Sequence, residues 1–483
     1  MLELWQFISP YILPLYYVVI FFVVIGLLLE NRNPLKTHSY LLLLLLLPIL
    51  GIMIYLFFGQ NIRKRKIFAK KRLINQAFGE QYFQNRIEHS EIDEIIPPHL
   101  TQFEKVIRFL KNDLSPLTQL NKVTLLKNGE EKFPQLLESL RNARHHIHIE
   151  YYIYEEGEIG NQIANILMER ARAGVTVRMI VDGVGSLGLT KAFFKKLIAA
   201  GVQVVEFMPV LFPSFTSKIN YRNHRKIVVI DGSIGYTGGI NISDRYINNG
   251  KFKTYWRDTH VKMEGEAVKT LQFLFILSWQ FVTQDEILPE SDFFPDIETS
   301  GNSLVQINAS GPDWELASIM DSFFLAINSA RRHVRIATPY FIPNESIMDA
   351  ITTAASSDIT VELIIPRESD SWIVKSASRS FVKQLLEAGV KVYFYEKGFL
   401  HSKVIIIDEN FASVGSANMD YRSFDLNHEV NAYFYDKNVV SELIAEFETD
   451  KTDSSEVTLQ RWKNRKLWPK LKESVCRLMA PLL

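Results

Sequence analysis

Two copies of one short motif place the same three residue types at the same spacing. Both copies read His-x-Lys-x4-Asp, with four apolar residues before the Asp, and they comprise His224, Lys226, Asp231, His401, Lys403 and Asp408. The offset that aligns His224 with His401 also pairs Gly238 with Gly415, Asn241 with Asn418, and Arg245 with Arg422. Chance would seldom produce two copies in register with matching residues downstream, so the pattern indicates a duplicated functional unit.

The residue types in this motif suit the chemistry of a phosphodiester. On a strand, a His and the Lys two positions later project from one face, whereas the Asp falls on the other face at the strand end. Lys ammonium groups and the amides of Asn241 and Asn418 can hold phosphate oxygens as charge builds up. One neutral His can attack phosphorus, and the other, protonated, can donate to the departing alcohol oxygen. We expect His and Lys to act together without a metal, because the Lys pair supplies the positive charge. Each Asp then fixes local structure.

A nucleophilic His also needs its far ring nitrogen held, so that it presents the correct tautomer. Candidate carboxylates stand at matching places downstream of the motifs, Asp258 after His224 and Glu429 after His401. We predict that each carboxylate orients the His of its own half, with surface ion pairing as the alternative. The alternative for the whole motif is that both His are satisfied core residues and both Lys are solvated.

The elements that would position these residues alternate between strand and helix signals in both halves. Strand-like stretches at 146–154, 175–181 and 203–207 correspond to 334–340, 359–365 and 391–395, with helical stretches between them. This order predicts a layered α/β unit, present twice, with the two His-x-Lys pairs converging at a pseudo-two-fold interface.

The N-terminal region has the pattern of two membrane-spanning helices. Uncharged stretches lie between Glu3 and Glu30 and between His38 and Arg63. Each exceeds the roughly 20 apolar residues that a helix needs to cross a bilayer. A run of basic residues follows: Arg63, Lys64, Arg65, Lys66, Lys70, Lys71 and Arg72. The positive-inside rule then predicts a hairpin with both termini and the catalytic part in the cytoplasm. A signal peptide or two buried helices are the alternatives.

Composition excludes several other classes of protein. Of the 483 residues, 47% are apolar and 22% charged, which excludes disorder. The 54 Lys and Arg balance the 54 Asp and Glu, which argues against a nucleic-acid binder. The single cysteine, Cys476, excludes an intramolecular disulfide and a cysteine-built metal site. The expected domains are a transmembrane hairpin (1–62), a basic juxtamembrane and linker region (63–125), two repeats (126–285 and 300–450) and a basic, aromatic tail (451–483).

The paired motifs resemble the phospholipase D superfamily, and over almost its whole length the chain is similar to its bacterial cardiolipin synthase family. Other stretches that carry the likeness are Glu30–Pro34, Leu46–Pro48, Phe58–Gly59, Tyr221–Lys226, Gly238–Asn241, Trp256–Asp258, Gly415–Asn418 and Arg422–Ser423. The resemblance implies a pair of α/β/α sandwiches with the active site between them. It also implies that all six motif residues are catalytic, with His224 as nucleophile and His401 as general acid and base. The reaction implied is transfer of a phosphatidyl group between two phosphatidylglycerol molecules, giving cardiolipin and glycerol without a cofactor, at the bacterial cell membrane.

Two further stretches favour a lipid substrate. The apolar, proline-broken loop Met208–Phe215 precedes the first motif, and it either dips into the bilayer or packs as a lid. In the tail, basic residues alternate with Trp and Leu between Arg461 and Leu478, which suggests either an interfacial helix on anionic lipids or docking on the globular part.

Three alternative functions remain at this stage. A membrane-bound phospholipase D hydrolase would use the same intermediate and let water resolve it. A nuclease of the superfamily is disfavoured by the neutral charge and the expected anchor. A catalytically inactive membrane scaffold would not need two intact motifs. The sequence leaves the oligomeric state open.

Overall fold

The computed structural model describes residues 2–29, 34–47, 51–52, 96–209, 220–285, 291–297, 301–314 and 316–480. The chain divides into two compact units. The first comprises Met1–Lys70 and Leu211–Asn220, and the second comprises Lys71–Val210 and Tyr221–Leu483. Both motifs lie in the second unit.

The first unit contains two described helices, α1 (Leu2–Leu29) and α2 (Pro34–Leu46), with Leu27 and Leu44 buried in one small cluster. In the part of the chain that the structure describes, no helix combines the length and the hydropathy of a membrane span. The predicted transmembrane hairpin is therefore not shown. Much of its second span, the basic run from Arg63 to Arg72 and most of the Met208–Phe215 loop lie outside the described residues.

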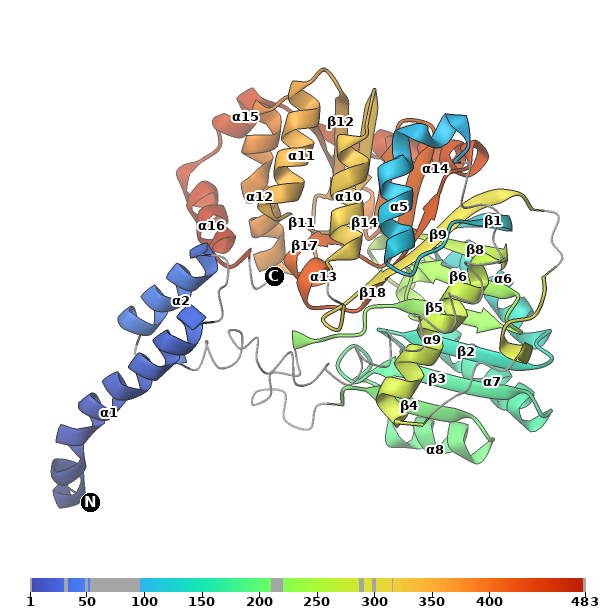
Figure 1. Ribbon diagram of the computed structural model, residues 1–483, viewed down its shortest axis with the longest axis horizontal. Helices are drawn as coiled ribbons and strands as arrows, with labels where there is room; N and C mark the ends of the chain where they lie inside the picture. Colours follow the sequence, from blue (N-terminus) through green and yellow to red (C-terminus); the bar gives the residue numbers. More distant parts are fainter. Residues whose placement is uncertain are drawn as a thin grey trace. The chain divides into compact units, whose positions relative to one another are not determined.

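One mixed sheet of 15 strands runs through both halves of the second unit (Figure 1). At its centre, β1 (Thr118–Lys127) of the first half pairs antiparallel with β9 (Ser303–Ser310) of the second. Outward from β1 come β8 (Thr259–Gly265), β6 (Ile234–Gly238), β5 (Lys226–Ile230), β2 (His146–Tyr151), β3 (Thr176–Asp182) and β4 (Gln203–Phe207). Outward from β9 come β18 (Glu429–Phe434), β16 (Phe411–Gly415), β15 (Val404–Ile407), β10 (His333–Ala337), β12 (Thr360–Pro366), β13 (Lys391–Tyr395) and β19 (Ser454–Val457). The matching order agrees with the predicted duplication and pseudo-two-fold symmetry.

Helices cover both faces of this sheet. On one face of the first half, α6 (Asn128–Arg141), α7 (Glu158–Arg172) and α8 (Lys191–Ala199) pack into one apolar core. Their counterparts in the second half are α10 (Ser318–Asn328), α11 (Glu345–Ser356) and α12 (Trp372–Glu387). On the opposite face, α9 (Ala267–Thr283) and α14 (Lys437–Thr452) share a third core that extends across both halves. Each half is thus a three-layered α/β/α arrangement, and the shared core joins the two.

The boundaries of the repeats in the structure differ from those predicted from the sequence. Residues 96–125, expected to be linker, include η2 (Pro98–Phe103), α5 (Glu104–Asn112) and most of β1. Val106 and Leu110 on α5 are buried in the core of the second half. The expected tail contributes β19, α15 (Leu459–Lys463) and α16 (Leu467–Arg477). The polar composition of both segments hid the buried residues that attach them to the second half.

Candidate active site

Each His-x-Lys pair lies where a central strand of its half begins. In the first half His224 precedes β5, which starts at Lys226. In the second half His401 and Lys403 precede β15. The four apolar residues that continue each strand are buried, as predicted for strands covered on both faces. Both pairs are therefore held at the ends of rigid, central strands.

The segment in front of the second motif pairs with the first half of the chain. β14 (Gly398–Leu400), directly before His401, pairs in parallel with β7 (Tyr255–Arg257). The backbone N–H of His401 donates to the carbonyl oxygen of Arg257 over 2.7 Å. Asp258 is the next residue, and its Oδ2 lies 2.7 Å from Nδ1 of His401. The first half therefore supplies the carboxylate for the His of the second half.

The same crossing occurs at the first motif. Asn223 forms a parallel bridge to His428, and the backbone N–H of His224 donates to the carbonyl oxygen of His428 over 2.9 Å. Nδ1 of His224 lies 3.0 and 2.9 Å from the two carboxylate oxygens of Glu429. The predicted orienting carboxylates thus contact the rings of the two motif histidines, but the prediction that each serves its own half is wrong. The reason is that the segment before each carboxylate crosses to the other half's motif.

The carboxylates fix the tautomer of both rings. A carboxylate only accepts hydrogen bonds, so Nδ1 of each ring carries the hydrogen and Nε2 of the neutral ring has a free electron pair. Burial lowers the pKa of His224; Glu429 opposes this shift and Lys226 adds to it. Burial and then the charge of Lys403 lower the pKa of His401 to about 4, against the effect of Asp258. Burial therefore favours the neutral form of both rings when the site is empty.

The surroundings of the two carboxylates differ. Ser416 donates its hydroxyl to Oε2 of Glu429 over 2.5 Å. At the equivalent position of the first half stands Gly239, where any Cβ would clash with the carboxylate of Asp258. The shorter Asp therefore approaches the backbone closely, whereas the longer Glu is held by a side chain.

The two lysines bring positive charge to the same place. Nζ of Lys226 donates to the carbonyl oxygen of His224 over 2.6 Å, and Nζ of Lys403 donates to that of His401 over 2.5 Å. Burial lowers the pKa of Lys226 to about 7 and that of Lys403 to about 8, although Glu429 and Asp258 raise both values. The charge of each Lys also lowers the pKa of both His, so the four groups form one electrostatic cluster.

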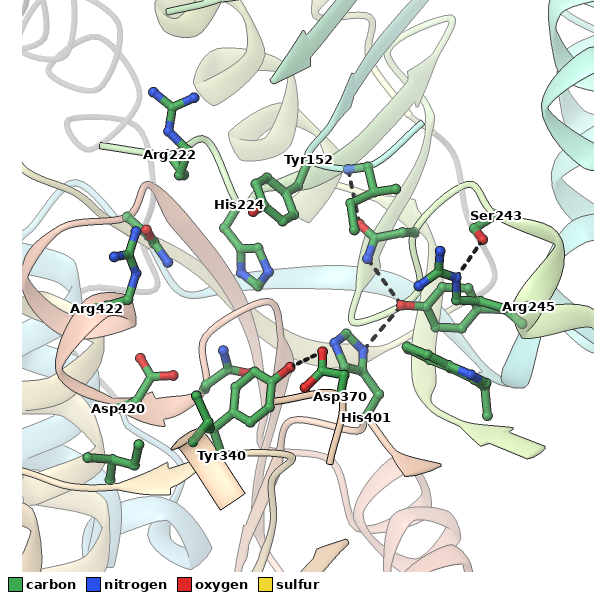
Figure 2. Close-up of a pocket in the computed structure, with 18 residues that line it drawn as sticks. Tyr152, Arg222, His224, Ser243, Arg245, Tyr340, Asp370, His401, Asp420 and Arg422 are labelled. Carbon is green, nitrogen blue, oxygen red and sulfur yellow. Dashed lines mark hydrogen bonds between the residues drawn. The ribbon is translucent and has the colours of Figure 1, made fainter. Parts of the chain in front are cut away.

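Both His line one cavity of about 360 Å³, whose lining residues Figure 2 shows. The lining consists of Tyr152, Ile153, Arg222, His224, Asn241, Ser243, Arg245, Tyr246, Trp256, Tyr340, Ile342, Asp370, Val374, His401, Asn418, Asp420, Arg422 and Asn427. Residues of both halves contribute to it. The predicted convergence of the two motifs at the interface of the repeats is thereby observed.

The two predicted phosphate-supporting amides also line this cavity. Asn241 donates to the hydroxyl of Tyr246 over 3.1 Å, and its oxygen accepts from the backbone N–H of Ile153 over 3.4 Å. The buried Oδ1 of Asn418 accepts no hydrogen bond from the residues that the structure describes. An amide whose oxygen lacks a partner can rotate to present its NH₂ group to a phosphate.

The two motif Asp residues do not line the cavity, and neither do the two motif lysines, which are buried beside the rings. The carboxylate of Asp408 accepts backbone N–H groups of Arg331, Arg332 and His333 over 2.8 to 2.9 Å. Asp231 accepts the three equivalent N–H groups before β2. Both Asp have a positive φ, 51° and 52°, at the turn that ends their strands. These contacts agree with the structural role predicted from strand parity, and they do not support the inclusion of either Asp among the catalytic residues.

Several lining residues were not among the predicted site residues. Tyr340 donates its hydroxyl to Asp370 over 2.7 Å, as Figure 2 shows. Arg222 pairs with the buried Asp182 over 3.1 Å. Arg245 and Arg422 could have been found, because they match at the motif offset and lie on opposite sides of the two rings in Figure 2. Tyr340 and Arg222 have no counterpart of their own type at equivalent positions, so duplication gave no signal for them.

None of the other buried histidines, His146, His148, His260 and His428, lines the cavity, although the backbone of His428 contacts His224. His146 and His148 contact Gln272 at 3.2 and 3.1 Å, outside the cavity lining. Among the residues that the structure describes, no group of three or more His, Cys, Asp or Glu side chains is arranged to hold a metal ion.

Comparison with known families agrees with this geometry. Residues 136–256 and 324–451 match the family model described as cardiolipin synthase, PLD-like domain. Residues 17–60 match the model described as phospholipase D-nuclease N-terminal. The chain is 43% identical over 468 residues to the cardiolipin synthase of Alkalihalophilus pseudofirmus, covering 96% of this chain and 92% of that protein. The chain belongs to the cardiolipin synthase family. The predicted family and the predicted enzyme class, a phosphatidyltransferase of the phospholipase D type, are thereby confirmed.

Two other family members and one solved structure are also similar to the chain. Cardiolipin synthase 2 of Bacillus anthracis is 44% identical and covers 94% of this chain and 88% of its own length. The probable cardiolipin synthase YwiE of Bacillus subtilis is 39% identical, with coverage of 97% and 93%. The crystal structure of a phosphatidylserine synthase from Haemophilus influenzae aligns with a TM-score of 0.58 at 15% identity, over 78% of this chain and 98% of that one. This last likeness establishes the fold.

Proposed function

We propose that the chain makes cardiolipin from two molecules of phosphatidylglycerol through a phospho-histidine intermediate. The observation that carries the proposal is the crossed pair of imidazole–carboxylate contacts, His224 with Glu429 and His401 with Asp258. Both rings border one cavity beside two buried lysines. The family match supports the identity of the lipid, and the resemblance to the superfamily supports His224 as the nucleophile.

In the first step, Nε2 of His224 attacks the phosphorus of the donor lipid and the bond from phosphorus to the glycerol oxygen breaks. Lys226, Lys403 and the two Asn amides hold the non-bridging oxygens. The bound phosphate offsets the charges of the two lysines, which raises the pKa of His401 from its value of about 4 in the empty site. Nε2 of His401 can then carry the proton that it donates to the departing glycerol.

In the second step, a terminal glycerol hydroxyl of the other phosphatidylglycerol gives its proton to Nε2 of His401 and attacks phosphorus. The bond from phosphorus to His224 breaks, and cardiolipin leaves. Glu429 stabilises the imidazolium character that His224 develops in both transition states. The two half-reactions balance to two phosphatidylglycerol consumed, with one cardiolipin and one glycerol released.

The arginines of the cavity would favour a lipid over water as the acceptor of the phosphatidyl group. Arg222 and Arg422 lie on the same side of the His pair in Figure 2, with Arg245 on the other side. At the position equivalent to Arg222 the second half has Phe399, so this side has a second guanidinium, which is held by its ion pair with Asp182. We assign Arg222 and Arg422 to the phosphate of the acceptor lipid, which water lacks. Arg422→Gln should therefore shift the product from cardiolipin toward phosphatidic acid, with phosphatidylglycerol still consumed; an unchanged product ratio would remove the assignment.

The reaction is tested with purified full-length protein and phosphatidylglycerol as the only lipid. Release of glycerol with formation of a four-chain lipid supports the proposal, whereas phosphatidic acid as the main product would make the chain a hydrolase. His401→Ala should slow turnover by roughly 10²- to 10⁴-fold, the usual contribution of a general acid.

The covalent step is tested with phosphatidylglycerol labelled at phosphorus. Protein quenched in alkali should carry label on His224, and His224→Ala should carry none. Label on His401 would reverse the two roles, and the absence of label from both rings would exclude the covalent mechanism.

We also propose that residues 1–62 anchor the protein in the cell membrane as a two-helix hairpin with the second unit in the cytoplasm. The support comes from the two uncharged stretches, the basic run that follows them, and the family match over residues 17–60. Cysteines placed at Glu3 and Lys64 test this in intact cells: protection of both from a reagent that does not cross the membrane agrees, and labelling of either from outside contradicts it.

A further inference from the structure

The C-terminal helix α16 presents its apolar side to solvent. Leu467, Trp468, Leu471, Val475 and Leu478 are between 51% and 81% exposed. With about 3.6 residues per turn they fall on one face of the helix, together with Met479. A helix of a globular protein normally buries such a face against its own domain, whereas the apolar face of α16 points away from the domain.

The opposite face of α16 is the docked one. Cys476 and Glu473 are buried there, and Glu473 accepts both guanidinium N–H groups of Arg465 over 2.6 and 2.8 Å. Arg477 lies over the ring of Phe381 on α12, 4.3 Å from its centroid. Figure 1 shows α16 beside α12. Both alternatives for the tail therefore find support: one face docks on the globular part, and the apolar face remains outward.

Basic residues border the exposed face. Between Arg461 and Leu478 the chain carries seven Lys and Arg against a single acidic residue, Glu473, which is paired. Lys466 and Lys472 are exposed and Lys470 is half-buried beside the apolar residues. A helix with exposed Trp and Leu flanked by lysines has the composition of helices that lie in the interface of an anionic bilayer.

The exposed surface continues to the rim of the active-site cavity. Trp372, which is 60% exposed, receives Nζ of Lys472 over its ring at 4.6 Å. It stands between Asp370 and Val374, which both line the cavity. A bilayer seated on α16 and Trp372 would therefore lie near two residues that line the cavity.

We propose that α16 and Trp372 form a docking surface for the anionic lipid bilayer, separate from the N-terminal hairpin. The surface seats the second unit on the membrane so that its cavity opens at the headgroup level. The apolar residues that enter the bilayer supply the affinity, and the bordering lysines supply the preference for anionic lipid.

The test places a fluorescent probe on the surface of the full-length protein in vesicles. The single native cysteine is removed by Cys476→Ser, and Leu471→Cys receives an environment-sensitive dye. Leu187→Cys, at a residue of the first half that is 62% exposed, is the matched control. The vesicles contain one part phosphatidylglycerol to three parts phosphatidylcholine. Both proteins also carry His224→Ala, so that the lipid is not consumed and the vesicle composition stays constant. The result therefore does not depend on the proposed reaction.

Lipids that carry a quencher on the acyl chain should quench the probe at 471 and leave that at 187 unchanged. Quenching should weaken in vesicles of phosphatidylcholine alone. Equal quenching of both probes by aqueous iodide would overturn the proposal. Protection at 471 from both iodide and lipid quenchers would also overturn it, because the face would then be covered by protein, either another part of this chain or a second copy.

Activity gives a second measurement. The triple variant Trp468→Ser, Leu471→Ser, Leu478→Ser should lower turnover of vesicle phosphatidylglycerol by roughly tenfold or more, because each large side chain gains about that factor on burial. Turnover of a short-chain soluble substrate should stay unchanged. The control triple Leu187→Ser, Ile198→Ser, Phe252→Ser removes apolar residues that are also exposed. Equal losses on both substrates, or equal losses in both triples, would contradict the docking surface.

Discussion

At the scale of single residues, the site is built from two imidazoles that each depend on a carboxylate from the other half. Strand periodicity alone was enough to place His and Lys on one face and to give each Asp a structural role, whereas the family resemblance counted both Asp among the catalytic residues. The need for a fixed tautomer identified Asp258 and Glu429 as orienting groups. Sequence spacing could not decide which ring each carboxylate contacts, because each follows its own motif at a separation that is compatible with either arrangement. The crossing depends on parallel pairing between β7 and β14, which is a tertiary contact.

Replacing each crossed carboxylate by its amide should separate the role of His224 from that of His401. Glu429→Gln should lower the rate of phospho-enzyme formation by roughly 10- to 100-fold, the usual effect of losing a group that orients a ring. Asp258→Asn should slow both half-reactions, because His401 protonates the departing glycerol in the first and takes the proton of the acceptor in the second. Rapid-quench measurement of labelled enzyme follows the formation and the decay of the phospho-enzyme separately. Asp349→Asn, an exposed carboxylate on α11, is the control. If Glu429→Gln left labelling of His224 unchanged, the crossed pair would have no part in the first step.

The lysines should make substrate binding weaken as the pH rises. Because the pKa values of Lys226 and Lys403 are about 7 and about 8, both lose charge between pH 6 and pH 9, whereas a phosphodiester keeps its single negative charge. In the His224→Ala protein, affinity for short-chain phosphatidylglycerol should fall by roughly tenfold or more over this range. Lys226→Arg should flatten the profile, since a guanidinium stays charged. The surface replacement Lys195→Arg should not change the pH dependence of the affinity. If the affinity were independent of pH in the His224→Ala protein with both lysines present, the proposed role of the lysines would be refuted.

At the scale of elements, the turns after β5 and β15 fix the C-terminal ends of the two strands that belong to the His-x-Lys-x4-Asp motifs. The sequence predicted these strands well, because four consecutive buried apolar residues leave few alternatives. It was less informative for α5, where charged residues surround a short buried stripe, and for α16, where the apolar residues do not face the core. Apolar periodicity shows that a helix has two faces without stating which one the protein buries.

Loss of a turn carboxylate should affect stability and spare the chemistry. Asp408→Ala leaves three backbone N–H groups without their acceptor and should lower the free energy of unfolding by about 1–3 kcal/mol. The turnover number of the folded protein should change by less than about threefold, since the residue does not touch the cavity. Asp349→Ala serves as the exposed comparison. Denaturant titration in detergent and active-site counting measure the two quantities, and a large fall in turnover without a loss of stability would restore a catalytic role to Asp408.

At the scale of the whole second unit, the two repeats are joined through one sheet and one shared core. The sequence predicted two similar units and their convergence, but it gave no sign that β1 and β9 pair at the centre. Asn121 strengthens this junction: its side chain donates to the carbonyl oxygen of Ser303 over 3.0 Å and accepts the backbone N–H of Ala267 over 2.7 Å. The two halves therefore share hydrogen bonds as well as apolar contacts.

The shared sheet should make both halves of the second unit open together. Amide hydrogen exchange of β5 and β15 in the full-length protein should report the same opening free energy, as expected for one cooperative unit. Asn121→Ala should lower both values by a similar amount, about 1–3 kcal/mol, because it leaves buried groups of both halves unpaired. Asn161→Ala, at an exposed site on α7, is the control. If Asn121→Ala reduced protection in only one half, the repeats would be independent.

The exchange of carboxylates across the seam has a consequence for how such a molecule can arise. A lone repeat would contain an imidazole without its own anion and an anion without its own imidazole. Two identical copies related by a two-fold axis would satisfy both needs at once, so a primitive single-module enzyme of this design could work only as a symmetric homodimer. Fusion of two genes then frees each module to diverge, and the replacement of an Asp–Gly environment by a Glu–Ser one is the kind of asymmetry that only a fused chain can acquire.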